Sequence, residues 1–411
     1  MRILFLCQYF PPEMGAPAAR TFEHAREWVR QGHHVTVLCG KPNHPSGVVP
    51  EEYRGSLLYR EVVDGVDVMR CWLFTTPNAG VIRRSLSFFT FMCSAVFFGL
   101  FAARGPWDVV AATSPQLLCG LAGWVLAFLK RRPFILEVRD LWPKQIIDLG
   151  TLRNPLVIAL LRRLERFLYR RARAIIAVAD ASRDEIIASG VPAAKVHTVT
   201  NGIDEDFFRP LDRVGPFRAA HGWGDDTLLI MYIGTHGLSQ GLHTVLEAAE
   251  RLRARTDLHF VLVGSGAERR RLMRRADEAG LDNVTFLPPQ PKADMPACYA
   301  AADLCLVPLR RLDVFLLNIP SKMFEIMACA RPIILGVEGQ AKALLEQAGA
   351  GIAVTPEDPQ ALAGAIERLA ADPNLRRQLG DRGRAHAVAH YSRRQKAADC
   401  LDIFAEVAGV R

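Results

Sequence analysis

Short apolar runs, each followed by a loop and a helical pattern, occur in two successive series along the chain. The first series starts with residues 2–7, passes through the loop QYFPPEMGAPAAR and a helical pattern, and reaches a second apolar run, HVTVL. The second series starts with TLLIMYIG at residues 227–234. Strands that alternate with helices predict parallel sheets covered by helices. We therefore expect an α/β protein with two Rossmann-like, doubly wound domains.

The length of the chain also favours two domains. Its 411 residues exceed what one core usually accommodates, and 50% of them are hydrophobic, which is enough for two cores. Between residues 200 and 226 the periodicity is lost and Gly, Pro and Asp accumulate, which is typical of a domain junction. We expect an N-terminal domain over residues 1–205, a C-terminal domain over residues 206–388 and a further helix over residues 389–411.

A helix start in the second domain combines two opposite charges. In the stretch NIPSKMFEIMACAR, Ser321 follows a proline, and Lys322 and Glu325 come next at positions i and i+3, on neighbouring parts of one helix face. An anion could rest on the ammonium group and the free N–H groups, while the carboxylate accepts hydrogen bonds from sugar hydroxyls. From this stretch alone, an ordinary helix with a solvated ion pair is an equally good interpretation.

Two strand-to-helix loops of the second domain contain glycines. Gly234 and Gly237 lie in the first loop, and Gly264 and Gly266 lie in the second. Two such loops side by side at one sheet edge suit a diphosphate and a nucleoside. Leu287, at the end of the next apolar run, completes the candidate binding set at this edge.

The first domain offers a second group of candidates. Gly15 and Ala16 follow the first strand, where Gly15 would let the backbone approach a phosphate or would relieve a tight turn. Asp140 follows the apolar run PFILEV, at the edge where α/β domains bind ligands. We interpret Asp140 as a residue that orients a ligand, with capping of the following turn as the alternative.

Composition narrows the possible partners. The formal net charge of +8 favours anionic partners, and we find no RNA-binding or DNA-binding motif. The nine cysteines are scattered without a Cys-x-x-Cys pair, and the eleven histidines show no metal-ligand spacing. We expect reduced cysteines, no metal and no cofactor. The N-terminus leads directly into a strand without a signal peptide, so we expect a cytoplasmic protein.

Two segments indicate a membrane surface. Residues 85–103 contain no charge and six phenylalanines, and their helical length nearly matches the bilayer core of about 30 Å. A span here would separate the first strands from their partners, so we expect a helix with one side on the sheet and the other toward lipid. A wholly buried helix is the alternative. Residues 156–173 have the pattern of a basic amphipathic helix, for which a solvated basic face is the alternative.

Several motifs together resemble a known family. TNGID, YIGTHGL, LVGSGAE and PSKMFEIMACARPII resemble the retaining glycosyltransferase family 4, which has the GT-B fold. QYFPPEMGAPAAR, EVRDLWP and PSKMFE resemble its bacterial branch that adds N-acetylated amino sugars, such as N-acetylfucosamine, to lipid-linked intermediates of surface polysaccharides. The resemblance covers essentially the whole chain. It implies two domains that face an interdomain cleft and a C-terminal helix that crosses back to the N-terminal domain.

The resemblance also implies roles for particular residues. Glu325 matches the second of two family glutamates and would bind the ribose hydroxyls, whereas the first glutamate is replaced by Leu317. The arginine and lysine that many members place in the first glycine loop fall at Thr235 and Gln240. The donor diphosphate would then rest on Lys322 and on two loop residues. These two residues are His236 and Gly237.

The expected function follows from the resemblance and the charges. We expect a metal-independent transfer of an N-acetylated amino sugar from a UDP-sugar, with retention, to a polyprenyl-diphosphate-linked acceptor at the inner face of the cytoplasmic membrane. Lys322 would stabilise the departing diphosphate, and Asp140 would orient the sugar or the acceptor. The alternatives are a transferase with a soluble or protein acceptor, and a non-catalytic nucleotide-binding subunit of an assembly complex.

Overall fold

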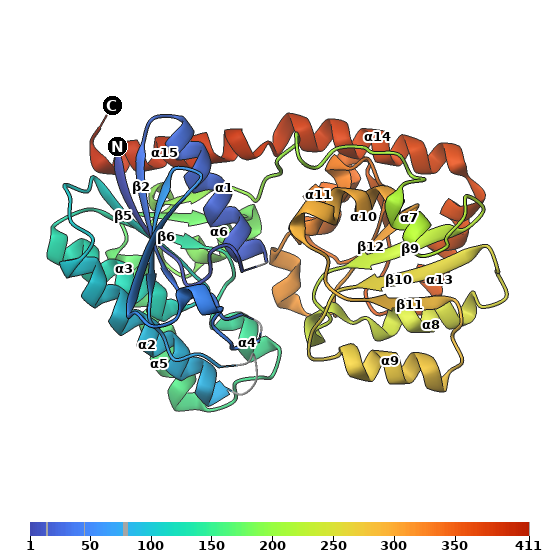
Figure 1. Cartoon of the computed structure of the whole chain (residues 1–411), viewed down its shortest axis with the longest axis horizontal. Coiled ribbons are helices and arrows are strands. Elements are labelled where there is room, and N and C mark those ends of the chain that lie inside the picture. Colours follow the sequence, from blue (N-terminus) through green and yellow to red (C-terminus); the bar gives the residue numbers. More distant parts are fainter. Residues whose placement is uncertain (14, 45, 77–80, 411) are drawn as a thin grey trace. The chain divides into compact units, whose positions relative to one another are not determined.

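The computed structural model describes residues 1–13, 15–44, 46–76 and 81–410 and divides into two compact units (Figure 1). Unit 1 comprises Met1–Asn201 and Arg393–Arg411, and unit 2 comprises Gly202–Ser392. Each unit is a mainly parallel sheet covered by helices, which confirms the predicted α/β fold class with two doubly wound domains.

Unit 1 contains an eight-stranded sheet with the strand order β3-β4-β2-β1-β5-β6-β7-β8. Its strands are β1 (Arg2–Leu6), β2 (His34–Gly40), β3 (Leu58–Val63), β4 (Val66–Cys71), β5 (Val109–Thr113), β6 (Phe134–Val138), β7 (Ala174–Ala177) and β8 (Val196–Thr198). Its helices are α1 (Ala16–Arg30), α2 (Val81–Phe101), α3 (Leu117–Lys130), α4 (Lys144–Asp148), α5 (Pro155–Arg171), α6 (Asp180–Ala188) and α15 (Arg393–Ala408). The strand order reverses between β1 and β5, and doubly wound folds commonly bind ligands at the carboxyl ends of the strands at such a point.

The C-terminal helix α15 completes the core of unit 1. It packs against α1, where the Trp28 indole Nε1 donates a hydrogen bond to the Ala397 carbonyl over 2.8 Å. The Trp28 ring also lies 5.2 Å from the Phe404 ring, centroid to centroid. A buried indole needs an acceptor for its N–H group, and α15 supplies it. The last helix of the chain therefore belongs to the hydrophobic core of unit 1.

Helix α2 lies on the outside of unit 1 and packs against α3, with smaller contacts to β2 and β4. Ser87, Phe91, Ala95 and Gly99 are buried at four-residue intervals, and a Cβ atom on Gly99 would approach Leu126 to 2.5 Å. The helix is long and apolar enough to cross a membrane by length and composition, but only 28% of its apolar window is buried. The alternative of a wholly buried helix is therefore wrong. We expected one side of the helix to pack on the sheet, but in the structure that side packs mainly on α3.

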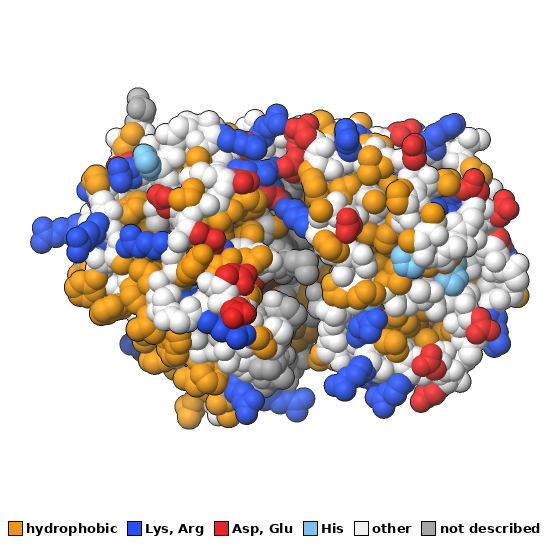
Figure 2. Space-filling model, in the orientation of Figure 1, with side chains coloured by type: hydrophobic (Ala, Val, Ile, Leu, Met, Phe, Trp, Pro, Cys, Tyr) orange, Lys and Arg blue, Asp and Glu red, His pale blue; other side chains and the backbone are white. Residues whose placement is uncertain are grey.

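The opposite side of α2 is exposed and continues over neighbouring helices, because α3 packs against both α2 and α5. We call this surface the apolar helical face. It consists of Ile82, Leu86, Phe89, Phe97 and Phe101 on α2, Phe128 and Leu129 on α3, and Leu156, Val157 and Leu160 on α5. In Figure 2, hydrophobic side chains gather along the lower left of the view, over α2 and α3, with Lys and Arg at the margin.

Unit 2 contains a six-stranded, fully parallel sheet with the strand order β11-β10-β9-β12-β13-β14. Its strands are β9 (Leu228–Ile233), β10 (Leu258–Val263), β11 (Val284–Leu287), β12 (Leu304–Pro308), β13 (Ile333–Gly336) and β14 (Gly351–Ala353). Its helices are α7 (Pro216–Ala220), α8 (His243–Arg251), α9 (Arg269–Glu278), α10 (Met295–Ala301), α11 (Lys322–Ala328), α12 (Gln340–Ala348), α13 (Pro359–Ala371) and α14 (Pro373–His390). The order reverses between β9 and β12, so the expected ligand crevice lies at the carboxyl ends of these strands.

Candidate active site

Lys322 lies at the point where the strand order of unit 2 reverses. It is the first residue of α11, and its Nζ atom is 4.0 Å from the centroid of the Tyr232 ring on β9. A Cβ atom on Gly234, just after β9, would approach the same Nζ to 2.5 Å. The side chain therefore crosses from α11 to the end of β9, and glycine at position 234 leaves room for the ammonium group.

The environment of Lys322 tunes its charge. Burial lowers the pKa of Lys322 to about 8, although the nearby Glu325 carboxylate acts in the opposite direction. Desolvation disfavours the charged form of an amine, and the aromatic face of Tyr232 returns part of that cost through a cation–π contact. The group is still mostly protonated at pH 7, which suits it to a ligand with negative charge.

Glu325 is held one turn further along α11. Its Oε2 atom accepts a hydrogen bond from the Tyr299 hydroxyl over 2.7 Å, and Tyr299 itself is buried in α10. Burial raises the pKa of Tyr299, and the Glu325 charge raises it further, so the phenol stays a donor. The carboxylate is half-buried and oriented by this bond. Its assignment to the ribose hydroxyls stays a prediction.

The two glycine loops of unit 2 form one connected structure. The His236 backbone N–H donates to the Ser265 carbonyl over 2.8 Å, and the Glu268 N–H donates to the His236 carbonyl over 2.9 Å. A Cβ atom on Gly264 would lie 1.9 Å from the Gly234 carbonyl oxygen, and one on Gly266 would lie 2.3 Å from the His236 carbonyl oxygen. Both glycines are therefore required by the packing of one loop on the other.

The structure differs from the expectation for His236. Its side chain is fully buried at 0% exposure, so the ring offers no surface for the diphosphate assigned to it. Burial lowers the pKa of His236 to about 4, and the charges of Arg269 and Lys322 act in the same direction. The neutral, enclosed imidazole lies next to the Phe286 ring at 6.1 Å, and neither of its ring nitrogens has a hydrogen-bond partner among the described residues.

Two further candidates in the first loop are already engaged within it. The Gly237 N–H donates to the Gln240 Oε1 atom over 3.1 Å. This N–H group, which we expected to bind the diphosphate, is therefore already engaged. Thr235 is exposed, and its carbonyl accepts a hydrogen bond from the Tyr232 hydroxyl over 2.7 Å. Gln240 thus closes the loop on itself.

The remaining unit 2 candidates lie at the same edge. The Leu287 side chain is buried at the end of β11, while its carbonyl accepts a hydrogen bond from the Gly264 N–H over 3.0 Å. Ser321 is the half-buried N-cap residue of α11, without a side-chain capping bond. Leu287 therefore positions the second glycine loop through its backbone.

Gly15 and Ala16 begin the first helix of unit 1. Gly15 is exposed and has φ 136°, a conformation that residues with a side chain rarely adopt. Its carbonyl accepts the hydrogen bond of the Ala19 N–H over 3.0 Å, and Ala16 is the first residue of α1. The tight turn at this position requires the positive φ angle and therefore explains the glycine. Contact of Gly15 with a phosphate stays a prediction.

Asp140 is half-buried just after β6, at the carboxyl edge of the unit 1 sheet. Burial raises the pKa of Asp140, whereas the neighbouring Arg139 charge lowers it. Asp140 does not cap α4, because that helix has Pro143 as its N-cap residue and no side-chain capping bond. Both interpretations of Asp140, as a residue that orients a ligand and as a cap of the following turn, stay predictions.

Sequence reasoning missed a buried ion pair behind Asp140. The Arg20 Nε atom lies 2.7 Å from Glu137 Oε1, and both side chains are almost fully buried. Burial alone would raise the pKa of Glu137, but the charges of Arg20 and Arg139 lower it. Arg20 also donates to the Thr200 and Val199 carbonyls at 2.7 and 3.0 Å. The lone charge of Glu137 within the apolar run PFILEV was the available signal.

A second missed residue, Glu13, joins two loops of unit 1. Its Oε1 atom accepts hydrogen bonds from the backbone N–H groups of Asn43 and His44, each over 2.9 Å. Burial raises the pKa of Glu13 to about 7, although these hydrogen bonds lower it. Glu13 therefore fixes the loop after β2 to the loop that precedes α1.

Comparison with protein families decides what this arrangement belongs to. Residues 215–386 match the family described as glycosyl transferases group 1, and residues 15–202 match the glycosyl transferase 4-like domain. The chain is a glycosyltransferase. The two matches fall on unit 2 and unit 1, respectively, so both units of the glycosyltransferase are accounted for.

This glycosyltransferase is similar to several known proteins over most of their length. The putative colanic acid biosynthesis glycosyl transferase WcaI of Escherichia coli K12 is 28% identical over 380 residues, which cover 90% of this chain and 92% of the relative. Among solved structures, sucrose-phosphate synthase from Thermosynechococcus elongatus superposes with a TM-score of 0.80 at 21% identity and covers 99% of both chains. Anabaena Alr3699/HepE, in complex with UDP and glucose, superposes with a TM-score of 0.74 at 19% identity, covering 98% of this chain and 99% of that chain. These neighbours confirm the GT-B fold.

Within residues 1–13, 15–44, 46–76 and 81–410, no group of three or more His, Cys, Asp or Glu is arranged to hold a metal ion. Among the charged residues at the end of the unit 2 sheet are Lys322 and Glu325, both on α11. A chemical role at that edge therefore falls first on these two side chains.

Proposed function

We propose that the chain transfers an N-acetylated amino sugar from a UDP-sugar to a polyprenyl-diphosphate-linked sugar in the biosynthesis of a surface polysaccharide, with retention of configuration. The observation that carries this proposal is Lys322, a half-buried ammonium group at the carboxyl end of β9. The match to WcaI over most of both chains supports polysaccharide biosynthesis, and the UDP complex of HepE supports the nucleotide.

Unit 2 is the proposed donor-binding unit. Negative charge develops on the diphosphate as the sugar leaves, and Lys322 stabilises that charge in a site partly withdrawn from water. Glu325, oriented by Tyr299, accepts hydrogen bonds from the ribose hydroxyls. The loops that contain Gly234 and Gly264 enclose the nucleotide with their backbones. The leaving phosphate takes the acceptor proton, so no protein nucleophile is needed.

Unit 1 is the proposed acceptor-binding unit, with Asp140 orienting the sugar or the acceptor. Its apolar helical face supports a lipid-linked acceptor, because Ile82 is 86% exposed and Leu156 is 80% exposed. Monomeric soluble proteins rarely expose a contiguous apolar surface of this kind. Arginines flank the face on α2 and α5, as expected for contact with anionic lipid headgroups. We therefore propose peripheral attachment to the inner face of the cytoplasmic membrane.

The test is transfer by the purified chain. The protein is incubated with a panel of UDP- and GDP-sugars and with a polyprenyl diphosphate N-acetylhexosamine, and the lipid product is analysed by mass spectrometry. We expect a mass gain of one N-acetylated sugar from a UDP donor only. Equal turnover of a soluble acceptor without a lipid chain would contradict the acceptor assignment, and UDP binding without any product would contradict the proposed reaction.

A further inference from the structure

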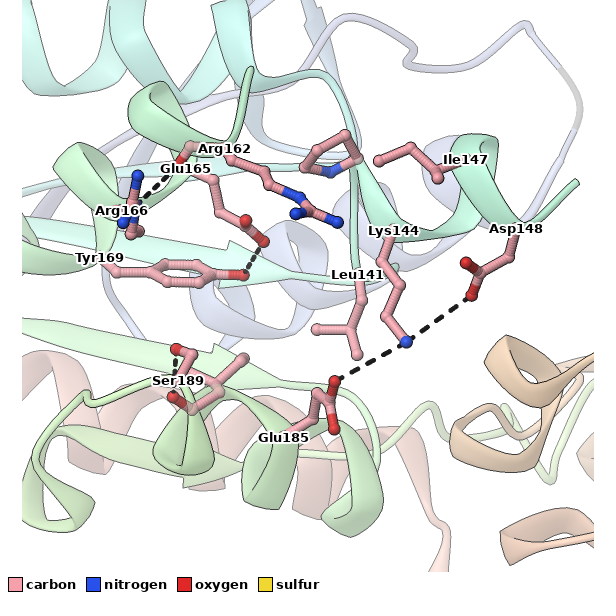
Figure 3. A pocket seen from close by; sticks show the side chains of 12 residues that line it. Leu141, Lys144, Ile147, Asp148, Arg162, Glu165, Arg166, Tyr169, Glu185 and Ser189 are labelled. Carbon is pink, nitrogen blue, oxygen red and sulfur yellow. Dashed lines mark hydrogen bonds and ion pairs between the residues drawn. The ribbon is translucent and has the colours of Figure 1, made fainter. Parts of the chain in front are cut away.

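A pocket of about 400 Å³ opens on unit 1 between α4, α5 and α6 (Figure 3). Its volume is within the range of small-ligand sites. The lining combines apolar side chains, including Leu141 and Ile147, with charged groups from all three helices. None of the candidate site residues lines this pocket. One of its lining residues, Leu141, nevertheless follows Asp140 directly in the chain.

The acidic groups of the pocket are already engaged. Lys144 Nζ lies 3.7 Å from Asp148 Oδ2 and 3.9 Å from Glu185 Oε1. Glu165 Oε1 accepts a hydrogen bond from the Tyr169 hydroxyl over 3.0 Å. Figure 3 shows both sets of contacts as dashed lines across the pocket. Burial raises the pKa of Glu165, whereas the Tyr169 hydrogen bond and the charges of Arg162 and Arg166 lower it.

Two arginines remain available at the same place. Arg162 and Arg166 lie one turn apart on α5 and both line the pocket. Within the described ranges of the chain, neither guanidinium has a carboxylate within ion-pair distance, and Arg166 Nε donates only to the Arg162 carbonyl, over 3.3 Å. The Arg162 side chain extends from α5 toward the middle of the pocket (Figure 3). The lining thus presents two guanidinium groups without a direct ion pair, although both charges act on the nearby Glu165 carboxylate and lower its pKa.

The position of the pocket links two parts of unit 1. At one side it adjoins the segment that follows Asp140, and at the other it is formed by α5. The same helix carries the exposed Leu156 and Leu160 of the apolar helical face. A lipid-linked acceptor has its hydrocarbon chain in the bilayer and its sugar at the transfer point, so its phosphates must lie between these two places.

We propose that this pocket binds the diphosphate of the lipid-linked acceptor, with Arg162 and Arg166 as its phosphate contacts. The proposal rests on the proposed function, because that function supplies the acceptor class. Guanidinium groups match phosphate oxygens with two parallel donors, and a pair of them one turn apart suits two linked phosphates. Leu141 and Ile147 provide an apolar wall for the first isoprene carbons.

The test uses the full chain and a soluble probe, farnesyl diphosphate, measured by isothermal titration calorimetry. The double variant Arg162→Gln/Arg166→Gln is expected to bind farnesyl diphosphate about 100-fold more weakly, because two charge-assisted contacts are lost. The matched control is Arg163→Gln, an exposed arginine of the same helix that does not line the pocket. It is expected to bind like the wild type. UDP affinity and the unfolding temperature are expected to be unchanged in both.

Other outcomes separate the possible sources of the phosphate. We expect inorganic diphosphate to compete with farnesyl diphosphate but to bind more weakly, since it lacks the apolar contact; equal affinities would overturn the assignment to a lipid. If the double variant loses only its binding to phosphatidylglycerol vesicles and keeps farnesyl diphosphate, the arginines contact the membrane and the proposal is wrong. No binding of farnesyl diphosphate to the wild type would also overturn it.

The result is distinguishable from a failure of the proposed function. If the transfer assay gives no product while farnesyl diphosphate binds and the double variant loses it, the reaction is wrong and the diphosphate site stands. If transfer occurs and the double variant raises the KM for the lipid acceptor without changing the KM for the donor, both stand. If the double variant leaves the KM values for both substrates unchanged, the pocket does not bind the acceptor and the proposal is wrong.

Discussion

The two units share a doubly wound design but use their surfaces differently. In unit 2, the loops at the carboxyl ends of β9 and β10 bond to each other, and their interlocked backbones leave room for one lysine, Lys322. In unit 1, exposed phenylalanines and a tryptophan cover part of the outer helices and strands, whereas the exposed large hydrophobic residues described in unit 2 are Leu and Val only. Unit 2 thus has two interlocked loops at one edge of its sheet, whereas unit 1 exposes large apolar side chains on its surface.

This difference indicates a division of labour. A rigid loop cluster with a single tuned cation suits a small charged ligand, because preorganised charges need no rearrangement during reaction. A broad apolar surface with flanking arginines suits a lipid boundary, where area matters more than precise geometry. Changes in either unit should therefore affect one property and leave the other intact, which makes the comparison testable.

The largest effect is expected for Lys322→Ala. The variant loses the cation that faces the departing diphosphate, and we expect kcat/KM to fall by about 10²- to 10³-fold, as for the loss of one preorganised electrostatic contact. The measurement is steady-state transfer with varied donor. Lys342→Ala, which removes an exposed lysine of α12, is the control and should remain within a few-fold of the wild type. Vesicle binding should not change, and a variant that keeps its activity would refute the donor site.

A smaller effect is expected for the double variant Phe89→Glu/Phe97→Glu. Both rings belong to the apolar helical face and are 51% and 56% exposed, so their replacement should leave the fold intact. Each ring contributes about 1.5 kcal/mol when it leaves water, and we expect flotation with phosphatidylglycerol vesicles to weaken about 100-fold. Val214→Glu, at an exposed apolar position of unit 2, is the control. If both proteins bind vesicles as the wild type does, the membrane assignment fails, and UDP affinity should be unaffected throughout.

The sequence predicted the architecture of both units because the apolar runs and the loops between them are local signals. A hairpin of β3 and β4 turns at Asp64 and Gly65, and it joins the sheet where β4 pairs with β2. The turn follows from two successive positive φ angles, 48° and 83°. Periodicity and turn chemistry are properties of short stretches, so one sequence suffices for them.

The finer geometry of the candidate site was not available from the sequence. His236 was assigned to the diphosphate because it lies in a glycine loop, but packing against the second loop encloses its ring. The pairing of Arg20 with Glu137 joins residues 117 positions apart, and no local pattern reports such a contact. Which polar groups of a loop face outward depends on the neighbouring loop, and that is a tertiary property.

The smallest effect concerns the pH dependence of UDP affinity, and it tests how burial tunes the charge of Lys322. Burial lowers the pKa of Lys322 to about 8, from an ordinary value of 10.5, so raising the pH through 8 removes its charge in the free protein. Apparent affinity scales with the competent fraction, and we expect it to fall about tenfold between pH 7 and pH 9. The facing Tyr232 stays neutral there, because burial raises its pKa far above this range.

The matched variant for this measurement is Lys322→Arg, since a guanidinium remains charged over the whole range. Any titration of UDP itself would appear in both proteins, so the difference between their profiles isolates the lysine. Unfolding does not produce the same trend: the unfolded chain keeps the lysine proton up to about 10.5, so loss of the proton in the folded state raises stability between pH 8 and 10.5. Identical profiles in the two proteins would show that UDP does not contact this ammonium group. The assignment of a charged ligand to unit 2, on which the contrast with unit 1 depends, would then be wrong.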